Sequence, residues 1–425
     1  MGNSAFTFHP GPLRGSVGVP GDKSISHRAL VAGAASAAPL RIANLNPGRD
    51  VKATREALAE LGARIAGDGD ELVVAGGQLA SPARTLDCMN SGSTARMLLG
   101  ACAGANLAAT FDGDESLRRR PMEPVAAQLR AFGAKIETTS GSLPMRLSGT
   151  PEIETRAFIL LAPSAQVKSA LIFAGLFAGV AVTIEGDRGS RDHTERLLHY
   201  LGAEIEWNQR SVRLAETALN GGTVEIAGDF SAAAFFITAA AITPGSALVV
   251  RGCGVNPART GLIEALQAMG AHIELRNRRT LCGEPVADIA VAAAPLTPAA
   301  ISADVTLRAI DEIPLIAVAA AFASGMTSIA GAADLRSKES DRVAAIGRLL
   351  DAVGIASEYE RGTIRIAGGA PALRAAEVAT IGAHRTAMAA GVLACAAGSL
   401  AIDSAESLEV SFPGFAAALR GLQRV

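Results

Sequence analysis

Aromatic side chains are scarce in this sequence, which has one tryptophan, two tyrosines and 13 phenylalanines among 425 residues. Hydrophobic residues nevertheless make up 49% of the chain, and 45 glycines accompany them. The apolar mass is therefore mostly small and aliphatic, which is typical of closely packed helices and sheets and excludes a disordered chain. Because one hydrophobic core rarely organises more than roughly 250–300 residues, the length predicts two domains.

An excess of either charge is also missing, since 39 basic and 41 acidic residues leave a net charge of −2. Such a chain has no global field for a polyanion, so we expect no nucleic-acid partner. The five cysteines lie far apart without a C-x-x-C pair, which indicates reduced thiols in a cytoplasmic protein rather than a disulfide framework or a zinc site. The polar, Gly/Pro-rich start has no apolar core of the kind that signal peptides have.

Several cofactor and nucleophile motifs are absent. There is no G-x-x-x-x-G-K-[ST] loop, no Rossmann glycine fingerprint after a strand, no H-E-x-x-H and no G-x-S-x-G elbow. We therefore expect no cofactor and no metal. The chemistry left open is acid–base and electrostatic, on a small anionic substrate.

Long uncharged runs are present, and by length alone some admit a membrane span. They are rich in Ala, Gly, Ser and Thr and are interrupted by Gly or Pro, which makes membrane insertion unfavourable. A helix that is apolar on all sides belongs in a protein core, so we expect buried helices and no membrane association. The runs are residues 169–184, 231–250, 313–333 and 386–402.

Two series of segments alternate along the chain about every 70 residues. The first is an amphipathic helix that ends in a small residue and is followed by alternating strands, as in ALAELGARI, QLRAFGAKI, LLHYLGAEI, ALQAMGAHI and LLDAVGIAS. Glycine suits the positive φ that ends a helix before a strand. The second is an apolar helix after a polar loop, beginning near residues 24, 92, 165, 230, 312 and 385. Six units, three per domain, follow from this alternation.

The sixth surface helix reaches residue 425 and leaves no sequence for the strands that follow it in the other units. The segment AFTFHPG near the start is able to supply one of them. We therefore predict an N-terminal domain of residues 18–230 and a C-terminal domain of residues 1–17 and 231–425. Two chain crossings then form a hinge around a ligand-binding cleft.

The loops before the apolar helices carry the polar residues. A helix N-terminus presents free N–H groups and a positive dipole end, so a start with Ser, Gly and a basic residue binds anions. In the first half these residues are Lys23, Ser24, Arg28, Asn90, Gly92, Ser93, Arg96, Arg120, Ser164, Gln166, Lys168 and Arg191. Pro121 predicts a helix beginning just after Arg120, Asp192 and Glu195 have the spacing of a capping box, and His193 is expected at the surface.

The second half differs because acids stand beside bases in its loops, an arrangement suited to proton transfer. The alternative for SKESDR is an ordinary helix start rich in residues that favour the first turn. The residues concerned are Asp311, Glu312, Lys338, Glu339, Arg342, His384 and Arg385.

Taken in order, these motifs resemble the enolpyruvyl transferases, and within them the 5-enolpyruvylshikimate-3-phosphate synthases. The matching segments are PGDKSISHRAL, NSGSTAR, RRRP, SAQVKSA, SRDHTE, GDFSAAAFF, DEIP, SKESDR and AHR. The resemblance implies an α/β fold of two similar domains, each of three βαβαββ units around buried helices, described as an inside-out α/β barrel. It implies a transferase that moves the enolpyruvyl group of phosphoenolpyruvate to the 5-hydroxyl of shikimate 3-phosphate and releases phosphate, in chorismate and aromatic amino-acid biosynthesis. We expect a cytoplasmic monomer.

The resemblance also implies residue roles. The acid–base residues would be Asp311, which takes the hydroxyl proton, Glu339, which handles the methylene proton, and Lys23. The shikimate 3-phosphate ligands would be Lys23, Ser24, Arg28, Ser164, Ala165, Gln166, Arg191, Asp311 and Lys338. The phosphoenolpyruvate ligands would be Lys23, Gly92, Ser93, Arg120, Gln166, Arg342 and Arg385.

Two other functions agree with some of these features. UDP-N-acetylglucosamine enolpyruvyl transferase shares the fold and the donor, but it typically has asparagine after the early lysine and a reactive loop cysteine. Here Ser24 follows Lys23, and no cysteine lies near residues 118–120. A non-catalytic repeat scaffold accounts for six units but not for Asp311 and Glu339 among basic loops.

Overall fold

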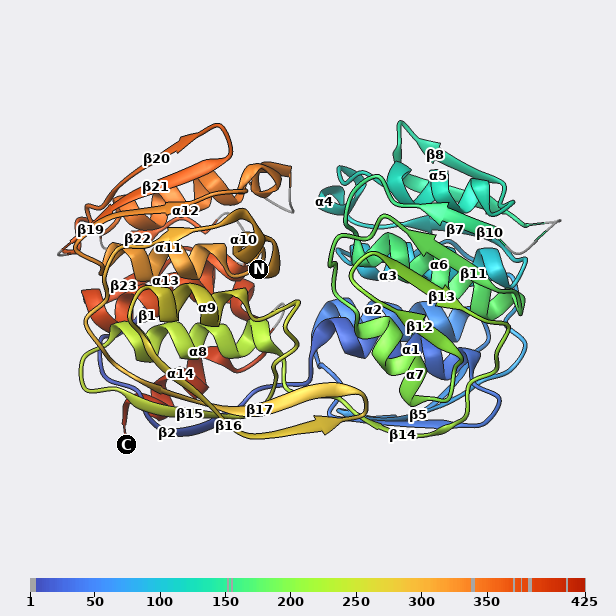
Figure 1. Ribbon diagram of the computed structural model, residues 1–425, viewed down its shortest axis with the longest axis horizontal. Helices are drawn as coiled ribbons and strands as arrows, with labels where there is room; N and C mark the ends of the chain where they lie inside the picture. The colour runs from blue at the N-terminus through green and yellow to red at the C-terminus, as the bar shows by residue number, and fades with distance from the viewer. Residues whose placement is uncertain are drawn as a thin grey trace. The chain divides into compact units, whose positions relative to one another are not determined.

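The computed structural model describes residues 5–150, 153, 156–337, 341–369, 371–375, 377–380, 384–409 and 412–424. They divide into two compact units (Figure 1). The first unit comprises the described residues of Met1–Pro20, Gly228–Arg279 and Pro285–Val425, and the second comprises those of Gly21–Ala227 and Thr280–Glu284. Residues 280–284 thus belong to the second unit, whereas the sequence predicts them in the C-terminal domain.

The second unit, which holds most of the N-terminal half, contains three four-stranded sheets with the orders β14-β3-β5-β4, β6-β7-β9-β8 and β10-β11-β13-β12. Their strands are β3 (Leu40–Ala43), β4 (Arg64–Asp68), β5 (Glu71–Ala75), β6 (Leu86–Asp87), β7 (Ala108–Asp112), β8 (Ile136–Thr139), β9 (Ser142–Ser148), β10 (Arg156–Ile159), β11 (Val182–Glu185), β12 (Ile205–Trp207), β13 (Ser211–Leu214) and β14 (Gly222–Glu225).

The first unit repeats the pattern with the orders β16-β17-β15-β2, β18-β19-β21-β20 and β1-β23-β22. Its strands are β1 (Phe6–Phe8), β2 (Arg14–Gly18), β15 (Ala247–Gly254), β16 (His272–Leu281), β17 (Glu284–Ala292), β18 (Ala300–Ile301), β19 (Gly325–Ile329), β20 (Ala356–Glu360), β21 (Thr363–Gly368), β22 (Glu377–Val378) and β23 (Leu400–Ile402). β1 pairs antiparallel with β23 and so supplies the strand that the sixth repeat lacked.

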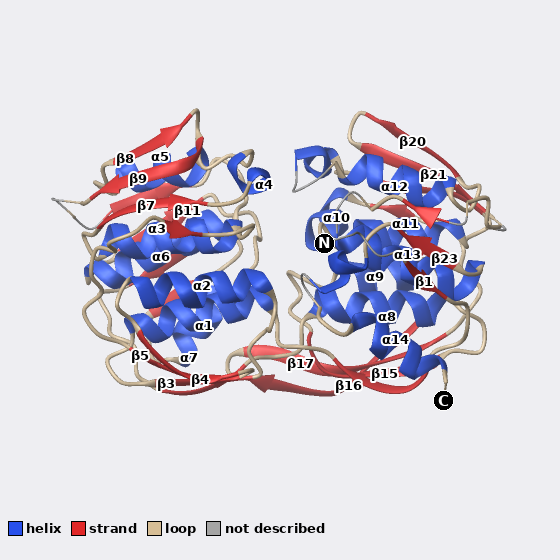
Figure 2. Cartoon of the chain, turned by 180° about the vertical axis from the view of Figure 1, so that it is seen from behind, coloured by secondary structure: helices blue, strands red, loops and turns tan. Residues whose placement is uncertain are grey.

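Each sheet joins a parallel pair to antiparallel neighbours. For example, β6 runs parallel to β7, and β7 runs antiparallel to β9. A parallel pair requires a crossover connection, and the buried helices provide it: α3 (Gly92–Gly104) connects β6 to β7, and α6 (Ala165–Ala178) connects β10 to β11. This alternation of strands and helices confirms the predicted α/β class, and Figures 1 and 2 show the sheets of each unit outside its buried helices.

The helices form the two expected series. The buried series is α1 (Lys23–Ala35), α3, α6, α8 (Phe230–Ile242), α11 (Ile313–Ala321) and α13 (His384–Ala397), each within one residue of its predicted start. The surface series is α2 (Arg49–Glu60), α5 (Glu123–Ala131), α7 (His193–Tyr200), α9 (Gly261–Ala268), α12 (Arg342–Asp351) and α14 (Phe415–Gln423). The short helices α4 (Glu115–Arg118) and α10 (Ala303–Arg308) and the 3-10 turns η1 (Ala333–Ser337) and η2 (Ala405–Glu409) complete the described elements. The glycines after five surface helices all have positive φ, between +72° and +109°.

Small residues allow the buried helices to approach closely. A Cβ added to Gly100 would lie 2.1 Å from the carbonyl oxygen of Ala170, and one added to Gly104 would lie 2.1 Å from that of Ala174. These glycines on α3 therefore let its backbone contact that of α6, and the polar starts of the two helices come together. No described helix is long and apolar enough to span a membrane.

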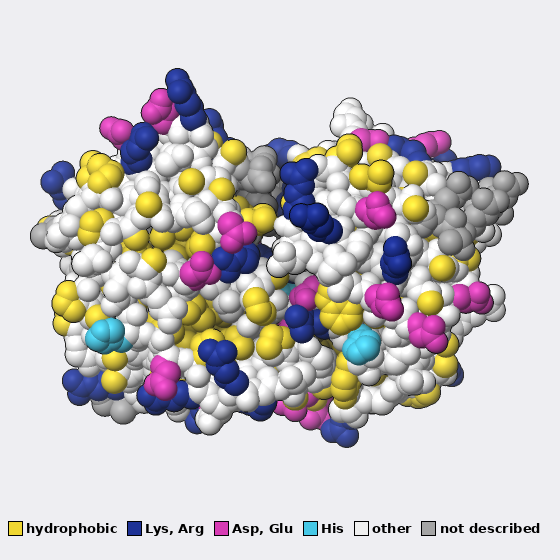
Figure 3. All heavy atoms as spheres, viewed as in Figure 1, with side chains coloured by type: hydrophobic (Ala, Val, Ile, Leu, Met, Phe, Trp, Pro, Cys, Tyr) yellow, Lys and Arg dark blue, Asp and Glu magenta, His cyan; other side chains and the backbone are white. Residues whose placement is uncertain are grey.

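The visible face carries charges of both signs. Figure 3 shows Lys and Arg side chains interspersed with Asp and Glu, with extensive uncharged surface between them. This distribution agrees with the nearly neutral net charge, and any strong anion binding must arise from local groups.

Candidate functional site

The starts of three buried helices lie together in the second unit. Each has a side-chain cap: Asp22 accepts from the Ile25 N–H of α1, Ser91 from the Thr94 N–H of α3, and Ser164 from the Val167 N–H of α6, at 2.9–3.3 Å. The caps fix the loop before each helix, while the other first-turn N–H groups and the positive end of the dipole are suited to binding an anion.

Gln166 connects two of these helix starts. Its amide nitrogen donates to Ser93 Oγ at 2.9 Å, and its amide oxygen accepts from Arg96 at 2.7 Å. Arg96 also donates to the Gly92 carbonyl at 3.3 Å. The structure thus brings the predicted Gly92, Ser93 and Gln166 into one group.

Gly92 lies where the neighbouring Arg96 side chain leaves no room for a Cβ atom. A Cβ there would lie 2.4 Å from a guanidinium nitrogen of Arg96 and 3.6 Å from one of Arg120. Arg120 in turn donates to the side-chain oxygen of Asn90. Arg120 therefore lies beside the start of α3, although α5 begins at Glu123 and not directly after Arg120 as predicted.

Arg28 is a buried cation held by neutral acceptors. It is 3% exposed and donates to Thr194 Oγ1 at 2.7 Å, Ser169 Oγ at 3.0 Å and the Ser24 carbonyl at 2.8 Å. Burial lowers the pKa of Arg28 to about 10; Glu195 opposes this and nearby Arg191 adds to it. In the described part of the chain Arg28 forms no ion pair, so its charge is available to a ligand.

Lys23, at the first position of α1, forms an ion pair with Asp50 of α2 at 2.7 Å. Its side chain is 25% exposed and that of Asp50 is 18% exposed. The ammonium group therefore remains accessible while Asp50 holds it in place. Ala165 begins α6, where its carbonyl accepts a hydrogen bond from Ser169 Oγ at 2.6 Å.

Three expectations for the second unit are wrong. Lys168 does not face a ligand, because it is 1% exposed and forms ion pairs of 2.7 Å with both Asp187 and Glu195. Glu195 is therefore part of a buried ion-pair group, and Asp192 makes no side-chain cap bond to α7, so the capping box is absent. His193 is 2% exposed rather than at the surface, and its Nδ1 lies 2.8 Å from Glu284 Oε1.

The first unit contains a separate cluster of acids and arginines around the start of α11. Arg342 lies 3.2 Å and Arg385 lies 3.8 Å from Asp311 Oδ1. Asp311 is 18% exposed, whereas Arg342 is 8% and Arg385 16% exposed. The structure thus brings together Asp311, Arg342 and Arg385. Two guanidinium groups beside one carboxylate favour its ionised form and provide forks for a phosphate or carboxylate ligand. The predicted Lys338 and Glu339 lie outside the described residues.

A family model described as EPSP synthase (3-phosphoshikimate 1-carboxyvinyltransferase) matches residues 8–419. The chain belongs to the EPSP synthase family. A 3-phosphoshikimate 1-carboxyvinyltransferase from Anaeromyxobacter sp. (strain Fw109-5) is 43% identical over 427 residues, covering 99% of both chains. One from Syntrophotalea carbinolica is 42% identical and covers 95% of each chain. The predicted family and its carboxyvinyl-transfer activity are confirmed.

Solved structures support the same family. An EPSP synthase from Acinetobacter baumannii has a TM-score of 0.88 and 35% identity, covering 99% of this chain and 98% of its own. An enolpyruvyl transferase from Streptomyces tendae, 19% identical with a TM-score of 0.77 over 99% and 98% of the two chains, shares the fold.

Within this EPSP synthase fold, sequence reasoning missed one charged residue of the Asp311 cluster. Arg259 is 5% exposed and lies 2.9 Å from Glu312 Oε2 and 3.7 Å from Asp311 Oδ2. It also donates to Ser231 Oγ, as does Arg385 at 3.3 Å. Arg259 stands in the segment NPARTG, which has none of the Ser/Gly-rich character of the other loops. The one available signal was a solitary arginine just before a predicted helix.

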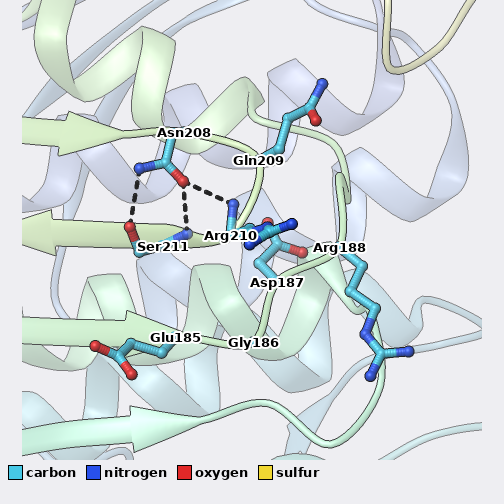
Figure 4. Close-up of a pocket in the computed structure, with 8 residues that line it drawn as sticks. All are labelled: Glu185, Gly186, Asp187, Arg188, Asn208, Gln209, Arg210 and Ser211. Atoms are coloured by element: carbon cyan, nitrogen blue, oxygen red, sulfur yellow. Dashed lines mark hydrogen bonds between the residues drawn. The ribbon is translucent and has the colours of Figure 1, made fainter.

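A cavity of about 800 Å³ opens beside the loop that leads to Arg191. Residues 185–188 and 208–211 line it, and Figure 4 shows Asn208 bonded to Ser211 at its rim. Asp187, on this loop, is the carboxylate that pairs with Lys168. None of the predicted ligand residues lines the cavity, so we assign it no part in substrate binding.

Proposed function

We propose that this chain transfers the enolpyruvyl group of phosphoenolpyruvate to shikimate 3-phosphate through the residues described above. The observation that carries the residue assignment is Arg28, a buried guanidinium whose hydrogen-bond acceptors are hydroxyls and a carbonyl. A buried guanidinium without a directly paired carboxylate is costly, and a phosphate ligand would supply a paired anion. This supports the assignment of Arg28 to the shikimate 3-phosphate site.

The acceptor's ligands in this proposal are Lys23, Ser24, Arg28, Ser164, the Ala165 backbone, Gln166 and Arg191, with Asp311 and Lys338. Phosphoenolpyruvate is held by Lys23, Gly92, Ser93, Arg120, Gln166, Arg342 and Arg385. Both substrates are multiply charged anions, and several fixed cations offset their repulsion. The monomeric state and the cytoplasmic location remain parts of the proposal.

The reaction needs one base and one proton carrier. Asp311 accepts the proton of the 5-hydroxyl as its oxygen attacks C2 of phosphoenolpyruvate, and a proton is added to C3. The adduct then loses phosphate together with a C3 proton, which restores the double bond. In this scheme Glu339 is the acid–base group for the C3 proton, and Lys23 stabilises negative charge between the two ligands.

Phosphate release tests the acceptor. Purified protein receives phosphoenolpyruvate alone, with shikimate 3-phosphate, or with UDP-N-acetylglucosamine, and phosphate is measured over time. We expect release only with shikimate 3-phosphate. Release without an acceptor would refute transfer, and release only with the nucleotide sugar would reassign the acceptor.

Replacing Asp311 tests its role as the base. Asp311→Ala should reduce kcat by roughly 10²–10⁴-fold, the usual contribution of a general base, while shikimate 3-phosphate still binds. Asp304→Ala, at a carboxylate 77% exposed on nearby α10, is the control and should keep normal turnover. Near-normal turnover in Asp311→Ala would exclude Asp311 as the base.

A further inference from the structure

Arg259 contacts two successive carboxylates with one nitrogen. Its NH1 atom lies 2.9 Å from Glu312 Oε2 and 3.7 Å from Asp311 Oδ2. The two acids stand at different depths, because Glu312 is 1% exposed and Asp311 is 18% exposed. The guanidinium of Arg259 therefore pairs with the fully buried acid and also faces the acid that is open to a ligand.

The backbone around Arg259 fixes the position of its side chain. The Arg259 N–H donates to the Asn256 carbonyl at 2.8 Å, and the buried Asn256 side chain accepts from the Ala258 N–H at 3.0 Å. The next helix, α9, packs so closely on α10 that a Cβ at Gly261 would lie 2.5 Å from the Val305 carbonyl. This turn holds the guanidinium against the start of α11.

Glu312 explains why a cation is required at this place. Its carboxylate is buried one residue from Asp311, and its polar neighbours among the described residues are Arg259, Arg385 and the hydroxyl of Ser231. Without Arg259, a second anion would stand next to Asp311 with Arg385 4.0 Å away. A like charge at such a distance raises the pKa of a carboxyl, as does the loss of a cation.

The two oxygens of Asp311 also have different surroundings. Arg342 and Arg385 both approach Oδ1, whereas Arg259 faces Oδ2 from 3.7 Å, which is beyond hydrogen-bond range. Arg259 therefore acts on Oδ2 through its charge rather than through a hydrogen bond to that oxygen.

We infer that Arg259 is a positioning residue for the transfer reaction, which keeps Asp311 ionised and oriented by neutralising Glu312 and facing Oδ2. The inference rests on the proposed function of Asp311 as the base. Arg259 itself touches neither substrate, so its loss should change kcat and its pH dependence rather than KM.

The direct test is the pKa of Asp311 without substrates. Protein labelled with ¹³C at the aspartate carboxyls is titrated by NMR, and the Asp311 signal is identified by its loss in Asp311→Asn. In Arg259→Met the pKa of Asp311 should rise by about one unit, since one nearby arginine usually shifts a carboxyl by 1–3 units. Arg259→Met/Glu312→Gln removes both charges and should return the pKa close to the wild-type value.

Kinetics supply the second readout. In Arg259→Met the acidic limb of the pH profile of kcat should shift by about one unit toward higher pH, so that kcat on that limb falls about tenfold below the wild-type value. The KM values for both substrates should stay within twofold of the wild-type values. Arg308→Met, which removes an arginine paired with Glu264 and Asp304, is the control and should keep the wild-type profile.

An unchanged Asp311 pKa in Arg259→Met, or an equal loss of kcat at every pH, would overturn the inference. If Arg259→Met does not fold, Arg259→Gln carries the test, because it removes the charge while keeping a hydrogen-bonding side chain, and an unchanged Asp311 pKa in that variant would overturn the inference. Wild-type protein that released no phosphate would refute the proposed function instead, while the NMR titration would still decide the role of Arg259.

Discussion

Replacing Lys168 by methionine should destabilise the unit that contains it, because two buried acids depend on this one cation. Lys168 is 1% exposed, and its Nζ lies 2.7 Å from both Asp187 and Glu195, which are 1% and 0% exposed. Burial opposes the charged form of Lys168, but the two carboxylates outweigh it and raise its pKa. The lysine therefore stays charged throughout the neutral range, and methionine removes that charge while keeping helix propensity.

The size of the effect follows from the charges left behind. Removing one partner of a buried ion pair costs about 3–5 kcal/mol. The alternative is that Glu195 takes up a proton in the variant, and this gives a similar figure. Keeping a carboxyl of ordinary pKa 4.5 protonated at pH 7 costs about 1.36 kcal/mol for each of the roughly 2.5 pH units, or about 3.4 kcal/mol. The predicted loss at pH 7 is therefore about 3–5 kcal/mol.

The penalty should depend on pH with a defined sign. Burial already raises the pKa of Glu195, and loss of Lys168 raises it further. In the variant, folded Glu195 then holds a proton at pH 7 that the unfolded chain has released. The contribution of Glu195 to stability therefore falls with rising pH by about 1.4 kcal/mol per unit above the unfolded pKa, and the penalty of the substitution should be smaller at pH 5 than at pH 7.

Urea unfolding followed by tryptophan fluorescence is the assay. Trp207 is the single tryptophan and lies on β12 of the same unit, where its Nε1 donates to Asp192 at 3.2 Å. Lys135→Met, at an exposed lysine of this unit, is the control, and Lys168→Met/Glu195→Gln should recover part of the loss. A penalty below about 1 kcal/mol at pH 7, or one independent of pH, would refute the reasoning.

Two further substitutions test packing and a long-range contact. Gly100→Ala should destabilise the same unit by about 1–3 kcal/mol, because the new Cβ would lie 2.1 Å from the Ala170 carbonyl oxygen. Gly347→Ala on α12 is the matched control, because a Cβ added there would have no neighbouring atom within 4 Å. Equal unfolding midpoints for the two variants would contradict close packing of α3 against α6. Glu284→Ala should lower the free energy of unfolding by about 1–3 kcal/mol, measured by Trp207 fluorescence, because it leaves His193 buried without its carboxylate partner. Glu274→Ala, at an exposed glutamate, is the control. An unchanged free energy of unfolding in Glu284→Ala would mean that this contact does not stabilise the unit.

Local chemistry made much of the backbone predictable. The buried helices α1, α3 and α6 begin where a polar loop meets an apolar run, because Asp22, Ser91 and Ser164 satisfy N–H groups only a few residues away. The helix ends were equally local, since Gly62 and Gly133 adopt the positive φ that a helix stop requires. The missing strand of the sixth sheet followed from counting repeats, and β1 supplies it.

The partners of charged side chains were not predictable in this way. Asp192 and Glu195 satisfied the spacing of a capping box, but Lys168, 27 positions before Glu195, provides a stronger partner for a buried carboxylate. His193 reads as an exposed residue of an amphipathic helix until Glu284, 91 positions later, is placed against it. Arg259 was missed for the same reason, because Glu312 lies 53 positions away.

Arg28 and Lys168 have different roles that the sequence alone does not distinguish. Both are basic residues in the first two turns of buried helices that follow a capped polar loop, and the sequence offers the same anion-binding interpretation for each. Both are also almost fully buried, so exposure does not separate them. Their partners do: two carboxylates form ion pairs with Lys168, whereas the hydrogen-bond acceptors of Arg28 are hydroxyls and a carbonyl, and no carboxylate pairs with it directly in the described part of the chain. Lys168 therefore stabilises the fold, and Arg28 is the stronger candidate for a phosphate ligand. This distinction rests on long-range pairing rather than on residue type.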